Sequence, residues 1–151
     1  MNTELEIMLM SGAKHIKVNE AGEYITLNFD DQSFLPRILN LMREVEQMAE
    51  EGSAKEAEIA AMPVETEKDQ YAQIIEKSNY DLQVCRKLCA KIDAAFGDAV
   101  CRKVFGNIVP SVALIGQFFS ELKNVIEKLA KEREENSPMR KYTEKYHSGE
   151  K

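Results

Sequence analysis

Apolar and polar residues alternate over residues 14–29, KHIKVNEAGEYITLNF, with the two-residue period of a β-strand. Residues 19–22, NEAG, interrupt the alternation and are typical of a turn, since glycine takes a positive φ without steric cost. We therefore predict a β-hairpin over residues 14–29, with an apolar face formed by Ile25, Leu27 and Phe29. An isolated hairpin is marginal in water, so this face is expected to lie on helices or on a partner's strand. The preceding residues 5–10, LEIMLM, offer a third strand for the same sheet.

A helical period of three and four residues follows the hairpin, and we predict a helix over residues 33–50 that ends at Gly52 and Ser53. Pro36 is tolerated in the first turn, where there is no intrahelical N–H bond to lose. Residues 53–68 are rich in alanine and glutamate, which indicates a short helix and then a loop. Side chains that can cap the first turn are those of Asp30, Asp31 and Ser33, and the apolar stripe consists of Phe34, Ile38, Leu41, Met42, Val45 and Met48.

A second and longer helical pattern covers residues 66–96, enough to span a small domain. Gly97 follows the last periodic residue and predicts a helix stop, and Asp98 is expected to cap a short helix over residues 98–105 that Gly106 closes. The two Phe-Gly pairs lack the spacing and the preceding strand of a dinucleotide-binding loop. The apolar positions of the long pattern are Tyr71, Ile74, Ile75, Leu82, Cys85, Leu88, Cys89, Ile92 and Phe96.

A third long helix is predicted over residues 111–135, with Ser111 as its cap and a break at Ser137 and Pro138. We expect residues 137–151 to form a flexible C-terminal tail. Together the patterns predict an α+β fold that is mostly α-helical, with one domain over residues 1–136. The stripe of the third helix consists of Ile115, Phe118, Phe119, Leu122, Val125, Ile126 and Leu129.

Composition and charge exclude some classes of partner. The net charge of −6 and the pI near 5.1 argue against a surface for a phosphate backbone, which needs clustered Lys and Arg. The one basic concentration, MRKYTEK near the C-terminus, is short and interrupted by Glu144, so we interpret it as a solvated tail rather than a nucleic-acid patch and expect no nucleic acid partner. No run approaches the roughly 20 apolar residues that a membrane span requires. The first ten residues, MNTELEIMLM, carry acids where a signal peptide carries lysines. The sequence therefore predicts a cytoplasmic protein with no membrane partner.

The chain offers few groups for catalysis or metal binding. Three cysteines, Cys85, Cys89 and Cys101, form an odd set without an export signal, so no disulfide framework is expected. The histidines, His15 and His147, lie near opposite ends of the sequence. The sequence has too few histidines at suitable positions for a Cys–His or Ser–His pair or for a four-ligand metal site. We therefore predict no enzyme, no bound metal and no cofactor.

A resemblance to a known family rests on three stretches. Residues 92–129, IDAAFGDAVCRKVFGNIVPSVALIGQFFSELKNVIEKL, contain two Phe-Gly pairs and then a helix with Phe-Phe. Residues 22–39, GEYITLNFDDQSFLPRIL, run from a hairpin strand into a helix, and residues 140–149, RKYTEKYHSG, form a basic ending with tyrosines. These features resemble the tail assembly chaperone-like proteins of long-tailed phages, which occur in prophages of Gram-positive bacteria.

The resemblance implies a function without catalysis. Such a chaperone binds the long helical tape measure protein, keeps its apolar faces soluble and releases it as tail-tube subunits polymerise. The implied partners are the tape measure protein and tail-tube subunits, and a homo-oligomer fits many copies on one client. The alternative, of a different class, is a structural minor tail or connector protein that is retained in the virion.

Apolar helix surface, rather than a reactive group, is the candidate functional feature. The stripe of residues 66–96 is long for a small domain, so part of it could serve self-association or a helical client, although such stripes more commonly build a core. The Phe-Phe pair of the third helix has the same two interpretations. Two tyrosines of the tail are four residues apart and could form one contact with a partner. The candidate partner-binding residues are therefore Tyr71, Ile75, Phe118, Phe119, Tyr142 and Tyr146.

Overall fold

The computed structural model describes residues 4–135, with side chains described to residue 132. The chain forms two compact units, which divide between Ser111 and Val112. The first unit contains a β-hairpin and the helices α1, α2 and α3, and the second contains α4. The fold is thus mostly α-helical with a small β part, as the sequence predicts. A single domain over residues 1–136 stays a prediction, and the predicted tail, residues 137–151, lies outside the described residues.

The predicted hairpin is confirmed. Strand β1 (Ala13–Lys17) pairs antiparallel with strand β2 (Tyr24–Asn28), and Ile16 lies opposite Ile25. Ile25 and Leu27 are buried, whereas the other face carries the exposed Tyr24, as the alternation predicts. The prediction of a third strand over residues 5–10 is wrong. Within residues 4–135 the sheet has two strands, and residues 4–10 form no regular secondary structure.

Helix α1 (Phe34–Ala60) is longer than predicted, because it does not end at Gly52 and Ser53. A glycine in a helix interior costs only about 1 kcal/mol, and the turns beyond it gain contacts with α2. Ser53 lies within the helix, and its hydroxyl donates to the carbonyl of Ala49, four residues earlier, at 3.2 Å. Ser33 occupies the predicted N-cap position, but its side chain accepts no capping hydrogen bond. The Asp31 carboxylate instead accepts hydrogen bonds from the N–H and the hydroxyl of Ser33.

Helix α2 (Glu67–Phe96) has the predicted extent, and local sequence explains both ends. At the start, the Thr66 hydroxyl accepts from the Asp69 N–H, and the Asp69 carboxylate accepts from the Thr66 N–H, each at 3.2 Å. At the end, Gly97 takes the left-handed conformation at φ 67° and donates its N–H to the Asp93 carbonyl at 2.8 Å. This confirms Gly97 as a helix stop.

Helix α3 (Val100–Phe105) begins later in the chain than the predicted range of 98–105. Ala99 occupies the N-cap position, so the prediction that Asp98 caps this helix is wrong. The Asp98 carboxylate accepts from the Ala99 N–H at 2.8 Å and pairs with Lys103 at 2.6 Å. Gly106 ends the helix, as predicted.

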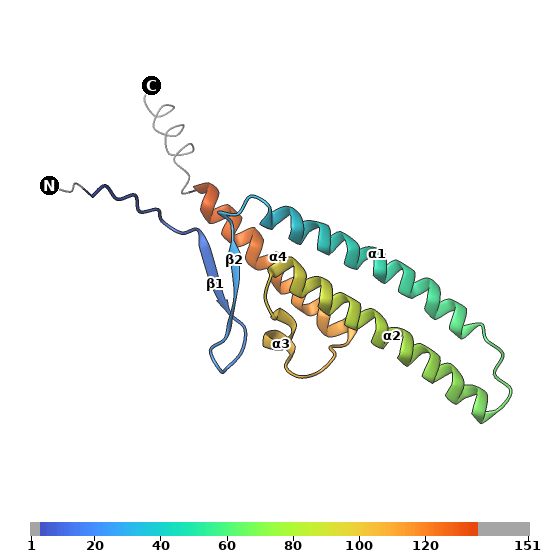
Figure 1. Ribbon diagram of the computed structural model, residues 1–151. Helices are drawn as coiled ribbons and strands as arrows, with labels where there is room; N and C mark the ends of the chain where they lie inside the picture. Colours follow the sequence, from blue (N-terminus) through green and yellow to red (C-terminus); the bar gives the residue numbers. More distant parts are fainter. Residues whose placement is uncertain (1–3, 136–151) are drawn as a thin grey trace, which may run out of the picture. The chain divides into compact units, whose positions relative to one another are not determined.

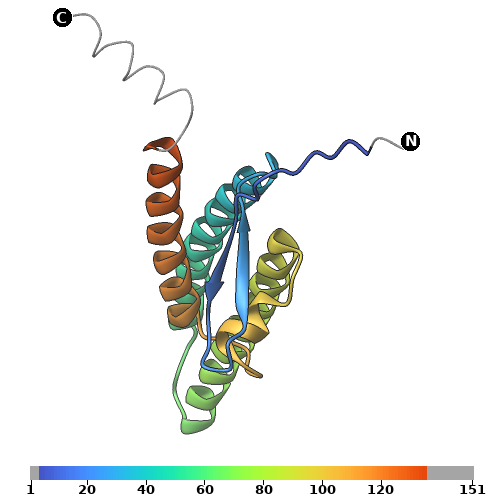
Figure 2. The same ribbon diagram turned by 90° about the vertical axis from the view of Figure 1, so that its left-hand side faces the viewer.

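The first unit has its core where α1 begins and α2 ends. The two helices run antiparallel, and the hairpin and α3 lie beside this end of the pair in both views (Figures 1 and 2). The Phe34 ring meets Phe29 at 6.1 Å and Phe96 at 5.8 Å between centroids, which connects the turn after β2 with α1 and α2. The buried side chains of this unit include Ile25, Leu27, Phe34, Ile38, Leu41, Cys85, Leu88, Ile92, Val100 and Cys101.

The second unit is described by α4 (Val112–Glu135), whose bounds agree with the prediction of residues 111–135. Its apolar residues recur every three or four positions and form one stripe along the helix. The least exposed side chains of this stripe are Ile115, Phe119, Leu122 and Ile126.

Candidate protein-interaction surface

The apolar stripe of α2 divides into a buried half and an exposed half. From Cys85 onward, the apolar side chains on the inner face are buried or half-buried. In the first turns, by contrast, Tyr71, Ile74 and Ile75 are each more than half exposed. One regular sequence pattern is therefore covered by other elements in one part of the helix and exposed in another.

The exposed half lies at the end of the α1–α2 pair that is farther from the sheet (Figure 1). Two more apolar residues, Met62 and Val64, are exposed in the loop between the helices. We call these five residues the tip patch; their exposed fractions run from 39% to 61%. Scattered exposed apolar residues are ordinary, but here five of them lie within 14 residues of the chain, in a loop and the first turns of the helix that follows it. The tip patch consists of Met62, Val64, Tyr71, Ile74 and Ile75.

The backbone beneath the tip patch is fixed by polar contacts. The Gln73 side chain donates to the carbonyl of Ile59 at 2.7 Å, which holds the start of α2 against the end of α1. Ile59 itself is buried, and the capping contacts of Thr66 and Asp69 fix the first turn. Because Tyr71 and Ile75 are four residues apart, they lie on the same face of α2. Tyr71, Ile74 and Ile75 are therefore presented on helical turns with a defined geometry, and Met62 and Val64 lie in the loop beside them.

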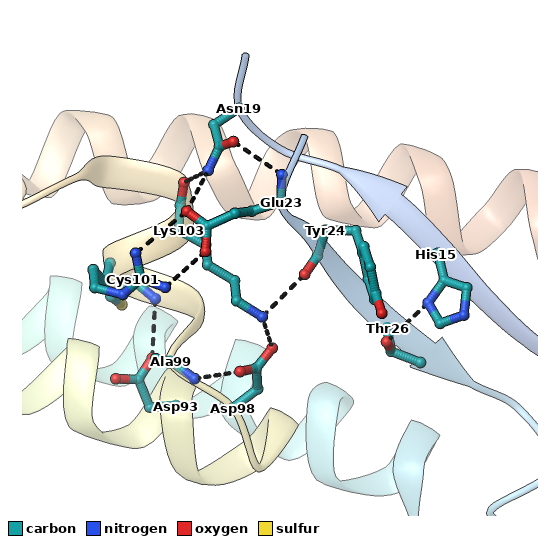
Figure 3. Close-up of polar contacts among 11 residues, drawn as sticks. His15, Asn19, Glu23, Tyr24, Thr26, Asp93, Asp98, Ala99, Cys101 and Lys103 are labelled. Atoms are coloured by element: carbon teal, nitrogen blue, oxygen red, sulfur yellow. Dashed lines mark hydrogen bonds and ion pairs between the residues drawn. The ribbon is translucent and has the colours of Figure 1, made fainter. Parts of the chain in front are cut away.

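A second cluster, which we call the hairpin–α3 junction, lies at the other end of the unit (Figure 3). The Asn19 amide donates to the Lys103 carbonyl at 3.0 Å and to the Glu23 carboxylate at 3.2 Å. Arg102 pairs with Glu23 at 2.7 Å, and Lys103 donates to the Tyr24 carbonyl at 3.2 Å. These contacts join the turn of the hairpin to a helix about 80 residues later in the sequence. Each of the side chains named here has a partner, so these contacts connect the hairpin to α3.

Charge pairing shifts the pKa values of the acids at the junction. The hydrogen bond from Arg102 lowers the pKa of Glu23, and the hydrogen bond from Lys103 lowers the pKa of Asp98. The pKa of Arg102 is raised by its hydrogen bond with Glu23. These directions keep both acids ionised at neutral pH and preserve the pairs.

The three cysteines are free thiols packed into the first unit. Burial raises the pKa of Cys85, Cys89 and Cys101, so all three stay protonated at neutral pH. Cys101 lies next to Cys89, with its sulfur 3.7 Å from the Cys89 carbonyl oxygen. The His15 ring is engaged elsewhere, with Thr26 at 3.2 Å and with the ring of Tyr24 at 4.4 Å. Among the described residues there is also no cluster of three or more side chains suited to holding a metal ion.

The predicted partner-binding residues do not come together in one place. Tyr71 and Ile75 belong to the tip patch, as defined above. Phe118 and Phe119 lie on α4 with ring centroids 5.5 Å apart; Phe119 is buried and Phe118 half-buried. Tyr142 and Tyr146 lie outside the described residues.

Sequence reasoning did not include Met62 and Val64 among the candidate residues, nor did it foresee the hairpin–α3 junction. The two apolar residues flank Pro63 in a short loop, and apolar side chains in a loop are the signal that could have indicated them. The junction carries no such signal, because its partners are about 80 residues apart and are ordinary surface residue types.

Comparisons with other proteins complete these observations. Across the described part of the chain, no helix has the length and apolar content needed to cross a membrane. Neither the curated proteins nor the solved structures include a significant match to the chain. The model of one family, described as a family of unknown function and designated DUF6673, matches residues 21–151. The match begins within the hairpin and covers all of the helices, so the chain belongs to the DUF6673 family.

Proposed function

We infer that this protein is a tail assembly chaperone of a long-tailed phage, which binds the tape measure protein through the tip patch and keeps that client soluble. The supporting observation is the exposure of Tyr71, Ile74 and Ile75 on one helical surface beside two further apolar residues. The resemblance of residues 22–39 and 92–129 to such chaperones supplies the class of client.

The spacing within the patch suits a helical client. Tyr71, Ile74 and Ile75 recur at intervals of three and four residues, which is the spacing by which one helix packs against another. An amphipathic segment of the client would place its own apolar stripe on these side chains. Burial of a leucine or isoleucine side chain contributes about 1.5–3 kcal/mol, so a few contacts give modest affinity for each copy. Modest affinity for each copy and many copies along one client would allow release during tail assembly.

The acids around the patch favour one kind of client helix. Glu65, Glu67 and Glu76 are exposed next to the patch residues. They outnumber the exposed lysines there, Lys68 and Lys77, of which Lys77 pairs with Glu56, and the whole chain carries a net charge of −6. A client stripe flanked by Lys or Arg would complement these acids, and the attraction would weaken with added salt. Binding is therefore expected to decrease moderately between low and high ionic strength.

The proposal implies that a tape measure protein is encoded near this chain, and co-expression of the two tests the function. We expect the client to be soluble with the native chain and to precipitate with a variant that carries Ile74→Ser and Ile75→Ser. A matched control carries Gln83→Ser and Lys87→Ser, two exposed positions on the same helix outside the patch, and should keep the client soluble. Circular dichroism of both variants checks that the helices are retained. A client that is equally insoluble with and without the native chain would contradict the proposal.

Composition of the virion separates this function from that of a structural component. A chaperone should be absent from purified particles, whereas a minor tail or connector protein should be present. Mass spectrometry of the particles gives that answer directly, and detection of this chain at a fixed copy number would overturn the chaperone assignment.

A further inference from the structure

The segment of residues 4–10 that precedes β1 carries the most exposed apolar side chains in the described part of the chain. Its five large apolar residues are 82–97% exposed, and the segment runs away from the sheet (Figure 1). So complete an exposure of consecutive apolar side chains is costly in water, which indicates that a partner covers them. The five residues are Leu5, Ile7, Met8, Leu9 and Met10.

The outer edge of β1 offers backbone groups that such a segment can pair with. The Val18 N–H donates to the Glu23 carbonyl, so by the alternation of an antiparallel pair the backbone groups of Lys14 and Ile16 point toward β2. The backbone groups of His15 and Lys17 therefore point away from β2. Within the described residues neither of these two residues has a backbone hydrogen bond on that side, and both side chains are exposed. The hairpin thus has an open edge.

The segment does not fold back onto this edge in its own chain. A two-residue turn at Ser11 and Gly12 would need a positive φ, and neither residue has one. The Gly12 N–H instead donates to the Asp30 carboxylate, and the Ala13 N–H donates to the Ser11 hydroxyl at 3.1 Å. A Cβ at Gly12 would come within 2.5 Å of an Asp30 carboxylate oxygen, so a larger residue there would displace the Asp30 side chain from its present position. These contacts direct residues 4–10 outward.

Residues 4–8 and the outer edge of β1 match in the placement of their apolar side chains and in charge. Ile16 lies on the same face of the sheet as the buried Ile25 and Leu27, whereas His15 and Lys17 lie on the other face. An added strand that places Leu5 and Ile7 on the face of Ile16 must place Glu4 and Glu6 on the face of His15 and Lys17. In the antiparallel register with Glu4 opposite Lys17 and Glu6 opposite His15, residues 4–8 cover all of β1.

The charges on β1 also favour this occupant over another copy of β1. Edge lysines such as Lys14 and Lys17 oppose pairing between two identical edges, because like charges would then lie close together. An acidic strand avoids this repulsion, and residues 4–8, which contain Glu4 and Glu6, can form such a strand.

We propose that residues 4–8 of one copy add as a third, antiparallel strand to the outer edge of β1 in a second copy. The interaction makes the protein a self-associating one, independently of any client. It places Leu5 and Ile7 of the exposed segment on the face of Ile16 and adds a strand to the edge that the hairpin leaves open.

Proline substitutions test the backbone pairing in the full-length protein. In the proposed register the N–H of Met8 donates to the Ala13 carbonyl, whereas the N–H of Ile7 points away from β1. Met8→Pro should therefore weaken self-association by about tenfold, and Ile7→Pro should weaken it much less, because both keep an apolar side chain and only the first loses an interchain hydrogen bond. Sedimentation over a range of protein concentrations measures the dissociation constants. A monomer at every concentration, or equal effects of the two prolines, would overturn the proposal.

A charge exchange tests the pairing of side chains across copies. Glu4→Lys and Lys17→Glu should each weaken the homo-oligomer, because each places like charges opposite one another. An equimolar mixture of the two single variants should recover part of the association, since in mixed pairs the introduced lysine of one variant lies opposite the introduced glutamate of the other. Absence of recovery in the mixture, with both variants folded by circular dichroism, would overturn the register.

Hydrogen exchange distinguishes pairing between copies from pairing within one chain. The amides of Glu4, Glu6, His15 and Lys17 should exchange more slowly as the protein concentration rises. Protection that does not depend on concentration would show an intrachain strand and would contradict the proposal.

Discussion

The two ends of the α1–α2 pair are built differently although they belong to the same two helices. Where α1 begins and α2 ends, apolar side chains such as Ile38, Leu88 and Ile92 are buried beside the hairpin and α3. At the far end, Ile59 is the one buried side chain between residues 50 and 81. Burial stabilises the near end, and mostly polar contacts hold the far end.

The polar contacts of the far end are nearly all exposed. Lys77 pairs with Glu56 at 3.0 Å, and the Lys55 ammonium lies 6.0 Å from the ring of Tyr80. Exposed ion pairs contribute little because water and salt screen them. The far end should therefore open locally more readily than the near end, although the capping contacts and the Gln73–Ile59 hydrogen bond hold its folded geometry.

The largest expected effect is the difference in stability between two isoleucine variants, one at each end of the helix pair. Ile92→Ala should lower the free energy of unfolding by about 2–5 kcal/mol, because it removes a fully buried side chain and leaves a cavity. Ile75→Ala should change it by less than about 0.5 kcal/mol, because that side chain is more than half exposed. Urea unfolding followed by circular dichroism measures both values. Equal losses at the two positions would contradict the division into a buried end and an exposed end.

A smaller effect is expected from the two amides that tie elements together. Asn19→Ala removes hydrogen bonds that join the hairpin to α3 and should cost about 1–3 kcal/mol. Gln73→Ala removes one hydrogen bond to Ile59 and should cost about 1 kcal/mol. Site-resolved hydrogen exchange sharpens the comparison, since the first variant should expose amides of the hairpin and the second those near residue 60. Identical exchange patterns in the two variants would argue against separate local connections.

Two glycines should respond with opposite sign. Gly97→Ala should destabilise by about 1–2 kcal/mol, because φ at this helix stop is 67° and an L side chain is strained there. Gly52→Ala should stabilise by about 0.5–1 kcal/mol, because this glycine lies inside α1 and an added Cβ meets nothing within 4 Å. Thermal and urea unfolding of the two variants provide the check. A destabilised Gly52→Ala protein would show that α1 does not continue through this position in solution.

The smallest expected effect is the acid dependence of the hairpin–α3 junction. The folded-state pKa of Glu23 is lowered below its ordinary value of 4.5, chiefly by the hydrogen bond from Arg102. A lowered folded pKa gives stability that is present above the ordinary value and is lost as the pH falls through the folded value. Glu23→Gln should therefore reduce the loss of stability between neutral pH and about pH 3, with little effect on the tip patch. Urea midpoints of both proteins across this range test it, and parallel pH profiles would contradict a role for the Glu23–Arg102 pair.

Local sequence was sufficient for most of the secondary structure. The period-two alternation and the turn at residues 19–22 predict the hairpin, and the helical periods together with Gly97 and Gly106 predict where α2 and α3 end. These signals act over a few residues, through φ preference, capping and alternation of apolar positions, so they can be interpreted without the rest of the chain.

The sequence by itself determined a mostly helical chain with an N-terminal hairpin, and it indicated that apolar helix surface is the feature to examine. Only the tertiary structure decided that α1 continues through Gly52, that the stripe of α2 is buried from Cys85 onward and exposed at Tyr71 to Ile75, and that Glu23 meets Arg102. The physical reason is that burial depends on which other segments pack at a given place. A periodic stripe has the same pattern whether another element covers it or water does.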